Sequence, residues 1–340
     1  MLKLDGYTVT DQIDENLDML MYRGYRTDNK QPVIIKTLKD QYVNPPRVAR
    51  LHDEYELNRH LKYPGIIQVY DLQPYHHHTW VLIMEDIQGD LLTNIIARES
   101  LNLTTCLSFA IQLVNILAYL HDYPLVYKNL NPTNIWVNLN LGQVKITNFN
   151  LSSRLQQEYQ FITPLVQFEE EIPTYFAPEQ TGRINRVIDY RTDFYLLGLV
   201  CYEMLVGHPP FQGANAAELI DWHIVKPPVL PSAIKVDIPL AISNIIMKLL
   251  AKSAEDRYQS ALGLNADLQN CLQQWQATNQ IKTFELGQLD IAPQLLISQQ
   301  LYGRTIELNT LSSALAGENT LRRFRSNSSE FRSAISSFPN

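Results

Sequence analysis

The sequence predicts an α+β fold with two lobes, and two observations carry this prediction. Segments of strand-like composition are concentrated in the first 87 residues, where Val, Ile and Tyr alternate with polar residues between turn-forming stretches. From Asp90 onward, apolar residues recur mostly with a helical spacing. Strands first and helices after, with little intermixing, are typical of the α+β class.

The first lobe is predicted from the order of its segments. Residues 7–38 alternate like strands and are interrupted by turn chemistry at Thr27–Pro32. Pro45–Leu61 has a helical period, and residues 66–72 and 80–87 are predicted to be paired strands.

The second lobe is predicted to be helical. Residues 103–121 carry apolar side chains at helical spacing over about five turns. Residues 191–207 are nearly all apolar, which indicates a buried helix. Later helical segments are expected at 216–225, 239–253 and 258–276.

The cysteines and histidines give no metal or disulfide pattern. Cys106, Cys201 and Cys271 lie far apart and none belongs to a C-x-x-C pair, which indicates a reducing compartment. His76–His78 occupy a turn, where neighbouring side chains point in different directions, so an exposed turn is favoured over a metal site.

Composition excludes several function classes. The chain is 45% hydrophobic and 19% charged, as expected for a globular protein with a substantial core. A net charge of −7 gives no electrostatic footprint for nucleic acid. We identify no apolar run long enough to span a bilayer, and the N-terminal residues lack the apolar core of a secretion signal. We therefore expect a cytoplasmic protein without membrane insertion.

Residues 127–150 are the most informative stretch. An apolar helix precedes YKNLNPTNIWVNLNLGQVKITNFN, a hairpin pattern lies inside it, and Asn148-Phe149-Asn150 closes it. It resembles the catalytic core of a eukaryotic-type protein kinase, in which H-R-D-L-K-P-x-N precedes two short strands and D-F-G. Matched in order, the motif positions fall on Tyr127, Lys128, Asn129 (catalytic Asp), Asn131 (catalytic Lys), Asn134 (metal-binding Asn) and Asn148 (D-F-G Asp).

Other motifs of that family occur in the right order. The resemblance implies roles for Lys36 on the third strand, Glu54 on the main helix of the small lobe, a gatekeeper and hinge in Met84-Glu85-Asp86-Ile87, Ala177-Pro178-Glu179 as A-P-E, Asp193 as the structural Asp of a buried helix, and Arg257 as the partner of Glu179. Each match is weak alone, whereas together and at family spacing they are highly specific.

The resemblance covers about residues 7–275. It implies a two-lobed protein-kinase-like fold with a five-stranded sheet and one main helix in an N-lobe at about 7–87, and a helical C-lobe at about 88–275. The most similar type is the N-terminal kinase-like domain of large bacterial multidomain sensor kinases. Residues 276–300 are expected to be a linker. Residues 301–340 resemble the start of an ATPase-like module without a Walker A sequence, followed by a disordered tail.

The chemical groups of a kinase are largely replaced. The Gly-rich loop positions fall on Asp14, Asn16 and Met19, which favours a simple hairpin turn over a phosphate-binding loop. Asn129 cannot accept a proton near neutral pH, and loss of a general base costs ~10²–10⁴ in rate. Asn134 and Asn148 offer only neutral amide oxygens to Mg²⁺.

The expected adenine pocket is narrower than in the family. Its roof carries Ile34 where the family has Ala, and its floor carries Trp136 where the family has an aliphatic residue. These side chains are expected to pack where the purine would lie; the alternative is that Trp136 tilts into the large lobe and leaves room. Lys36, Glu54, Met84, Glu85 and Ile87 complete the nucleotide positions.

These features favour a pseudokinase that acts as a regulatory or scaffolding module with protein partners in signalling, without a required cofactor. A weak ATP-binding serine/threonine kinase, an ATP-binding switch without turnover, and a degenerate product without a role stay open as alternatives. ATP and Mg²⁺ are expected to bind weakly at most, and Glu179, Asp193 and Arg257 are expected to be structural.

Overall fold

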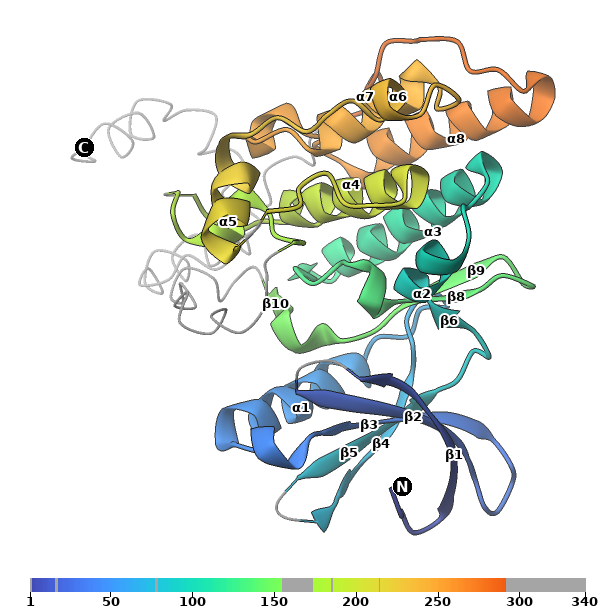
Figure 1. The fold of residues 1–340 in the computed structure, drawn as a ribbon, viewed down its shortest axis with the longest axis vertical. Coiled ribbons are helices and arrows are strands. Elements are labelled where there is room, and N and C mark those ends of the chain that lie inside the picture. Colours follow the sequence, from blue (N-terminus) through green and yellow to red (C-terminus); the bar gives the residue numbers. More distant parts are fainter. Residues whose placement is uncertain are drawn as a thin grey trace, which may run out of the picture. The chain divides into compact units, whose positions relative to one another are not determined.

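A five-stranded antiparallel sheet forms the small lobe in the computed structural model of the chain (Figure 1). The structure describes residues 2–15, 18–76, 79–154, 174–184, 186–213 and 215–291. In the sheet order β1-β2-β3-β5-β4, the strands are β1 (Tyr7–Glu15), β2 (Met19–Arg26), β3 (Pro32–Leu38), β5 (Trp80–Glu85) and β4 (Val69–Pro74).

The two central strands are buried on both faces. One face of β3 and β5 packs with Leu51 of α1 (Pro45–Asn58), and the other face packs under Tyr22. This double burial explains why β3 is nearly a continuous apolar run. The helix α1 begins at the N-cap residue Asn44, whose side chain accepts a hydrogen bond from the backbone N–H of Arg47.

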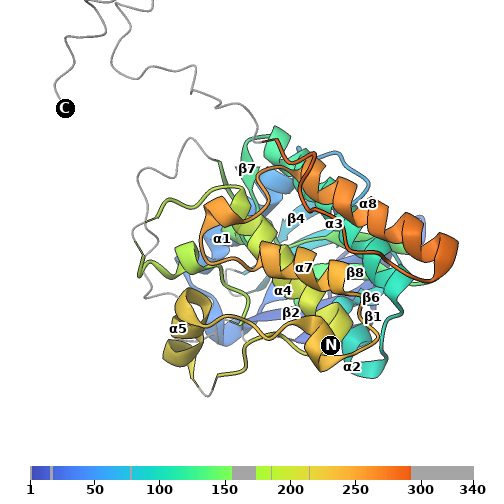
Figure 2. The ribbon, with the colours of Figure 1, turned by 90° about the horizontal axis from the view of Figure 1, so that it is seen from above.

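The large lobe is built mainly from helices, which stack above the sheet in Figure 1 and are seen from their outer side in Figure 2. The prediction of a two-lobed α+β fold is thereby confirmed. The helices are α2 (Leu92–Arg98), α3 (Leu103–Asp122), α4 (Arg191–Val206), α5 (Ala216–Val225), α6 (Pro231–Ile234), α7 (Leu240–Leu249) and α8 (Ala261–Thr278). The short strands are β6 (Asp90–Leu91), β7 (Leu125–Val126), β8 (Ile135–Asn138), β9 (Gln143–Ile146) and β10 (Ser153–Arg154).

Helix α3 corrects one expectation from the sequence. Leu103–Asp122 is long and apolar enough to cross a membrane by length and composition, although no such segment was expected. Its side chains instead form part of the large-lobe core, and ten of its residues are buried. Within the described part of the chain it is the one helix that passes this test, and burial identifies it as a core helix.

Helix α4 lies in the middle of the large lobe and is apolar on nearly its whole circumference, as predicted. Gly198 allows it to approach α7 closely. A Cβ atom at this position would lie 2.8 Å from the Cβ of Leu249, so a larger residue would push the two helices apart.

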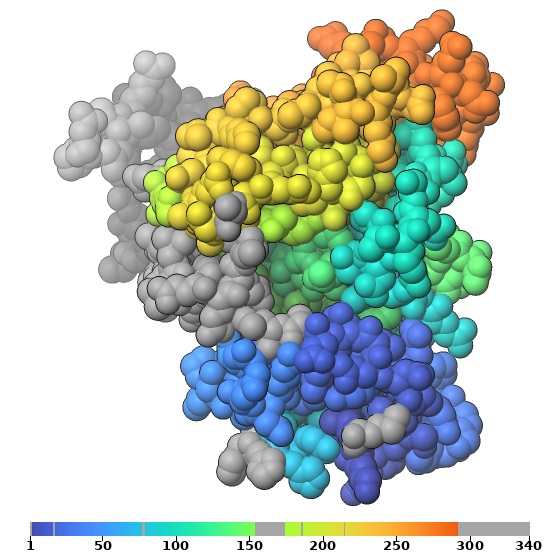
Figure 3. Space-filling view, in the orientation of Figure 1, coloured from blue at the N-terminus to red at the C-terminus, as the bar shows by residue number. Residues whose placement is uncertain are grey.

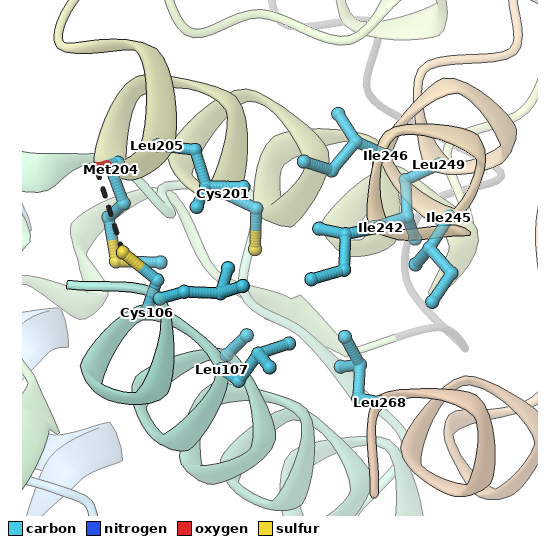
Figure 4. A pocket seen from close by; sticks show the side chains of 12 residues that line it. Cys106, Leu107, Cys201, Met204, Leu205, Ile242, Ile245, Ile246, Leu249 and Leu268 are labelled. Carbon is cyan, nitrogen blue, oxygen red and sulfur yellow. Dashed lines mark hydrogen bonds between the residues drawn. The ribbon is translucent and has the colours of Figure 1, made fainter. Parts of the chain in front are cut away.

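A small apolar pocket remains between α3, α4, α7 and α8 (Figure 4). Its volume of ≈ 20 Å³ is about the space that one water molecule needs. The lining includes the thiols of Cys106 and Cys201, and burial raises the pKa of the Cys106 thiol to about 12. The lining has no charged or amide side chain, so the pocket is a packing feature of the core.

Glu203 on α4 is expected to make the stability of the fold depend on pH. Burial raises the pKa of its carboxyl to about 7, and its Oε2 atom has no hydrogen-bond partner. Because the folded-state pKa exceeds the unfolded value, the stabilisation is present at low pH and is lost as pH rises from about 4.5 to about 7. The Glu203→Gln variant should therefore unfold with a flatter pH profile and gain at most about 3 kcal/mol above pH 7.

Urea unfolding at several pH values between 5 and 8 measures this effect. Glu285 supplies the matched control, since its side chain is exposed and Glu285→Gln removes an equal charge from solvent instead of from the protein interior. Equal profiles for the wild type and Glu203→Gln would contradict the prediction.

The chain after α8 stays in contact with the large lobe. The segment assigned above to a linker, 276–300, begins with the last residues of α8, and Ile281, Phe284 and Leu286 pack against the core. Several sequence predictions lie outside the described residues: Asn16, His77, His78, the end of the linker at 292–300, and the module and tail at 301–340.

Candidate functional site

Lys36 and Glu54 form a buried ion pair between the sheet and α1. Lys36 Nζ lies 2.7 Å from Glu54 Oε2, and the two residues are 5% and 1% exposed. The same Nζ donates to Oδ1 of Asn148 at 3.1 Å. The pairing predicted from the sequence is therefore present, and it extends to Asn148, two residues after β9.

The three groups at this junction come from three different elements. Lys36 lies in the centre of β3, Glu54 lies in the last turns of α1, and Asn148 follows β9 with a φ of 63°. Asparagine tolerates this left-handed conformation better than other residues with a side chain. The conformation brings the amide of Asn148 to the lysine.

The Asn148 side chain begins a network of amides. Its Nδ2 donates to Asn134 Oδ1 at 3.1 Å, and Asn134 Nδ2 donates to the backbone carbonyl of Asn129 at 2.9 Å. The Nδ2 of Asn129 returns to the backbone carbonyl of Asn148 and to Oδ1 of Asn150, both at 3.0 Å. The network is closed, because each amide satisfies a neighbour.

Asn131 belongs to the same network and also caps a short helical turn. Its Nδ2 donates to the backbone carbonyl and to Oδ1 of Asn129. Its Oδ1 accepts from the backbone N–H and the hydroxyl of Thr133, at the start of the 3-10 turn Pro132–Asn134. Asn131 stands at the position of the family's catalytic lysine, and its side chain caps the turn Pro132–Asn134.

The loop before Asn129 is held from below by Asp193 at the start of α4. This carboxylate is fully buried and accepts from the backbone N–H groups of Tyr127 at 3.0 Å and Lys128 at 2.7 Å. His121 Nε2 lies 2.9 Å from the same group. The arrangement fixes Lys128 at a φ of 62° and so determines the direction in which the next residue, Asn129, projects.

The amide oxygens do not make a good magnesium site. Oδ1 of Asn148 faces the cationic Lys36, and Oδ1 of Asn134 accepts from the amide of Asn148. Mg²⁺ prefers anionic oxygens and octahedral geometry, whereas these donors are neutral and already bonded to protein N–H groups. No cluster of three or more His, Cys, Asp or Glu side chains that could hold a metal ion occurs among the described residues. The residues present therefore do not fit the metal ions that kinases use.

Trp136 lies on β8, at the position predicted to form the floor of the adenine pocket. It is 2% exposed and belongs to one buried cluster with Ile34 of β3, Met84 of β5 and Leu91 of β6. Its indole Nε1 has no hydrogen-bond partner. The indole is thus buried in the same cluster as the predicted roof, Ile34, and the predicted gatekeeper, Met84.

Polar contacts connect the hinge to both lobes. Glu85 pairs with Lys145 of β9 at 2.6 Å, and its other oxygen accepts from the backbone N–H of Gln68. Asp86 pairs with Arg23 of β2 at 2.8 Å. The side chain of Asn138 donates to the backbone carbonyl of Ile87 at 2.8 Å, so part of the hinge backbone is already engaged.

The hairpin of β1 and β2 does not form a phosphate-binding loop in its described residues. β1 and β2 pair as far as Glu15 opposite Leu20, which leaves a short connection. Burial raises the pKa of Asp14, and the negative charges of Asp90 and Glu15 raise it further. Acidic side chains therefore crowd the end of the hairpin, and Glu15 pairs with Lys39 at 2.7 Å. Met19 pairs with Leu38 at the start of β2.

Tyr127 and Phe149 are core residues between α1 and the large lobe. Their ring centroids are 5.0 Å apart, and both side chains are buried. Asn58, the last residue of α1, is 1% exposed, yet neither atom of its amide has a hydrogen-bond partner. Glu54 Oε1, one turn earlier, is also unpaired. The buried face of α1 therefore carries polar atoms of Glu54 and Asn58 that have no hydrogen-bond partner.

Glu179 and Arg257 form the second buried ion pair of the site region. Arg257 Nη1 and Nη2 lie 2.6 and 2.9 Å from the two carboxylate oxygens, and the residues are 5% and 1% exposed. The neighbouring Gln180 donates to the backbone carbonyl of Lys128 at 3.0 Å. The Glu179–Arg257 pair therefore holds the segment whose Gln180 contacts the loop of Lys128 and Asn129.

Sequence reasoning identified the residues of the two ion pairs and the Asn positions, and the structure brings them together. It missed the hinge contacts of Arg23, Lys145 and Asn138. The helical period of Pro45–Leu61 places Asn58 on the same face as Leu51, and the structure buries both, but the missing hydrogen-bond partners of Asn58 were not predicted. The hinge contacts carried none, since their partners are more than fifty residues away.

Comparison with known proteins supports the family resemblance that the sequence motifs of residues 7–275 indicate. The family model described as "Protein kinase domain" matches residues 20–272. A probable serine/threonine-protein kinase of Clostridium perfringens is 30% identical over 239 residues, which cover 70% of this chain and 34% of that protein. The serine/threonine-protein kinase PrkC of Bacillus subtilis is 27% identical over 240 residues, or 69% of this chain and 36% of PrkC.

A third relative has a different overall organisation. Hybrid signal transduction histidine kinase G of Dictyostelium discoideum is 28% identical over 311 residues, which cover 66% of this chain and 9% of that protein. The chain thus spans about a third of the two serine/threonine kinases and a much smaller part of the hybrid kinase.

Proposed function

Because the chain belongs to the protein kinase family, we propose that it is a kinase-like domain without effective phosphoryl transfer, acting in signalling as a regulatory or scaffolding module. The observation that supports this most is the closed amide network of Asn129, Asn134 and Asn148. It joins the positions of the base and of both metal ligands through neutral groups.

The network offers a physical explanation for a stable site without metal or nucleotide. In a family member that uses ATP and Mg²⁺, the D-F-G Asp faces the metal ions and the catalytic-loop Asp accepts the substrate proton. Amides at these two positions carry no charge that a metal ion must neutralise, and they can both donate and accept hydrogen bonds. Asn148 accordingly accepts a hydrogen bond from Lys36 while Lys36 stays paired with Glu54.

The rate of phosphoryl transfer is expected to be low, because the groups that assist it are replaced by amides. Asn129 cannot accept the proton of a substrate hydroxyl, and Asn131 uses its amide to cap Pro132–Asn134. The losses act on one transition state and are not additive, but all lower the rate.

We expect ATP to leave the melting temperature of the protein unchanged within about 1 °C, with or without Mg²⁺. A protein that bound ATP at a hundred times its Kd would gain about 2.7 kcal/mol, which a thermal unfolding experiment resolves easily. ADP in place of ATP tests whether the γ-phosphate matters. A large Mg²⁺-dependent shift would contradict the proposal. A shift without Mg²⁺ and without phosphoryl transfer would favour an ATP-binding switch.

The second candidate is a weak serine/threonine kinase, which the Lys36–Glu54 pair at 2.7 Å favours. Transfer of labelled phosphate from ATP to the protein itself or to a generic substrate would support it, provided that Lys36→Ala abolishes the signal. Transfer that persists in Lys36→Ala would indicate a contaminating kinase.

We place the domain in the cytoplasm, with protein partners in signalling and without nucleic acid. The relatives' names support a place in signal transduction, and the activity of any longer protein that contains this domain is part of the proposal.

A further inference from the structure

The chain does not leave the large lobe at the end of α8. The kinase-domain match stops at residue 272, and α8 ends at Thr278. We propose that residues 281–291, called the strap here, belong to the folded large lobe, and that Asp290 is a positioning residue for the loop that carries Arg257. This inference does not depend on whether the domain transfers phosphate.

The apolar half of the strap is anchored in the core. Ile281, Phe284 and Leu286 pack against the cluster that contains α3, α4 and α8. The backbone N–H of Lys282 donates to the side chain of Gln274 at 3.0 Å. These contacts fix the path of the chain back along α8.

The polar half of the strap ends in a carboxylate that caps a loop. Asp290 Oδ1 accepts from the backbone N–H of Ser260 at 2.8 Å and from its hydroxyl at 2.9 Å. The backbone N–H of Gln259 points at the same carboxylate, 2.9 Å from Oδ2. Ser260 is itself the N-cap of α8, so one charged group orders the entry of that helix.

Two glycines make this approach possible. A Cβ atom on Gly263 would lie 2.5 Å from the Cα of Asp290, so only glycine leaves room for the strap. Gly287 has a φ of 76°, and its backbone N–H donates to Oδ2 of the buried Asp267 at 2.8 Å. The hydroxyl of Tyr258 donates to the same oxygen at 2.6 Å.

The capped loop leads directly to the second buried ion pair. Arg257 lies two residues before Gln259 and donates to Glu179 through both terminal nitrogens. Gln259 also accepts from Arg191 at 2.9 Å through Oε1 and from the Tyr190 hydroxyl at 2.9 Å through its backbone carbonyl.

The contacts therefore form one continuous path through the large lobe. It runs from Asp290 to the loop 257–260, then through the Arg257–Glu179 pair to Gln180, which contacts the backbone of Lys128. Through this path the carboxylate of Asp290 supports the segment around Glu179, about a hundred residues earlier in the chain.

Amide hydrogen exchange in the full chain tests the proposal. In Asp290→Ala we expect at least tenfold faster exchange at Gln259 and Ser260, whose N–H groups lose their acceptor, and at Gln180, whose segment loses its support. Amides in the middle of α3 should keep the wild-type rate. Asp290→Asn retains one acceptor oxygen and should show a smaller increase at the same three positions.

Gly263→Ala tests the same contact from the other side, because the added Cβ displaces the strap without changing Asp290. It should accelerate exchange at the same three amides. Because both substitutions disrupt one contact, the acceleration in the double variant should be smaller than the sum of the two single effects. Asp237→Ala is the control, since it removes an equal charge from an exposed position of the same lobe. Unchanged exchange at Gln180 in Asp290→Ala, or acceleration throughout α3, would overturn the proposal.

Discussion

The Trp136→Ala variant is expected to lose about 3–5 kcal/mol in the free energy of unfolding, as is usual when a buried tryptophan is truncated. Trp136 is 2% exposed and fills the space beside Ile34 and Met84. Its indole nitrogen has no partner, so the loss comes from packing and not from a broken hydrogen bond. Urea unfolding measures the change.

The same variant should acquire affinity for adenosine, because removal of the indole opens a flat apolar slot at the hinge. At ten times its Kd, adenosine would restore about 1.4 kcal/mol of the lost stability. The wild type should gain nothing under the same conditions. Adenosine carries no phosphate, so this experiment examines the slot separately from the amide network.

Trp222→Ala serves as the control for this pair of measurements. Trp222 is partly buried in the large lobe, where Lys226 lies 3.3 Å from its ring centroid. Its truncation should cost less and create no response to adenosine. Equal stabilisation of the wild type and Trp136→Ala by adenosine would show that the indole leaves the slot open and would refute the prediction.

Arg257→Met is expected to destabilise the large lobe by about 3–5 kcal/mol, because Glu179 is then left as an unpaired buried carboxylate. Arg257 also donates to the backbone carbonyls of Ala251, Arg191 and Lys252, which lose their partner as well. The size of the effect therefore reflects stranded polar groups more than the attraction within the pair.

The surface pair of Arg183 and Asp221 provides the comparison. Its side chains are 41% and 60% exposed, so Arg183→Met should cost no more than about 1 kcal/mol. The double variant Glu179→Leu with Arg257→Met removes both charges and should recover part of the loss. If denaturant unfolding gives similar values for Arg257→Met and Arg183→Met, the assignment of Glu179 and Arg257 as a brace is wrong.

Most of the fold could be predicted because its signals are local. Alternation in residues 7–38 and the helical period of residues 103–121 each depend on neighbours within a few positions. The boundaries shifted where a long-range contact decides them. Residues 66–68 were expected in a strand, for example, but Ile66 makes only an isolated bridge to Ile146, and β4 starts at Val69.

The site was predictable in its composition and less so in its contacts. Motif spacing identified Asn129, Asn134 and Asn148, since these positions follow from the order of residues along the chain. That they bond to one another could not be derived, because an amide can donate, accept or turn to solvent. The strap escaped prediction for a related reason: Asp290 caps a loop about thirty residues earlier in the chain.

The sequence by itself determined which chemical groups stand at each kinase position, because a neutral amide cannot become a carboxylate in any conformation. Only the tertiary structure decided how those groups are used. Packing turned Trp136 toward Ile34 and Met84, joined the asparagines into one network with Lys36, and laid Asp290 over the start of α8. Such choices depend on side-chain rotamers and distant neighbours, which are specified by the packed protein as a whole and not by any short stretch of the chain.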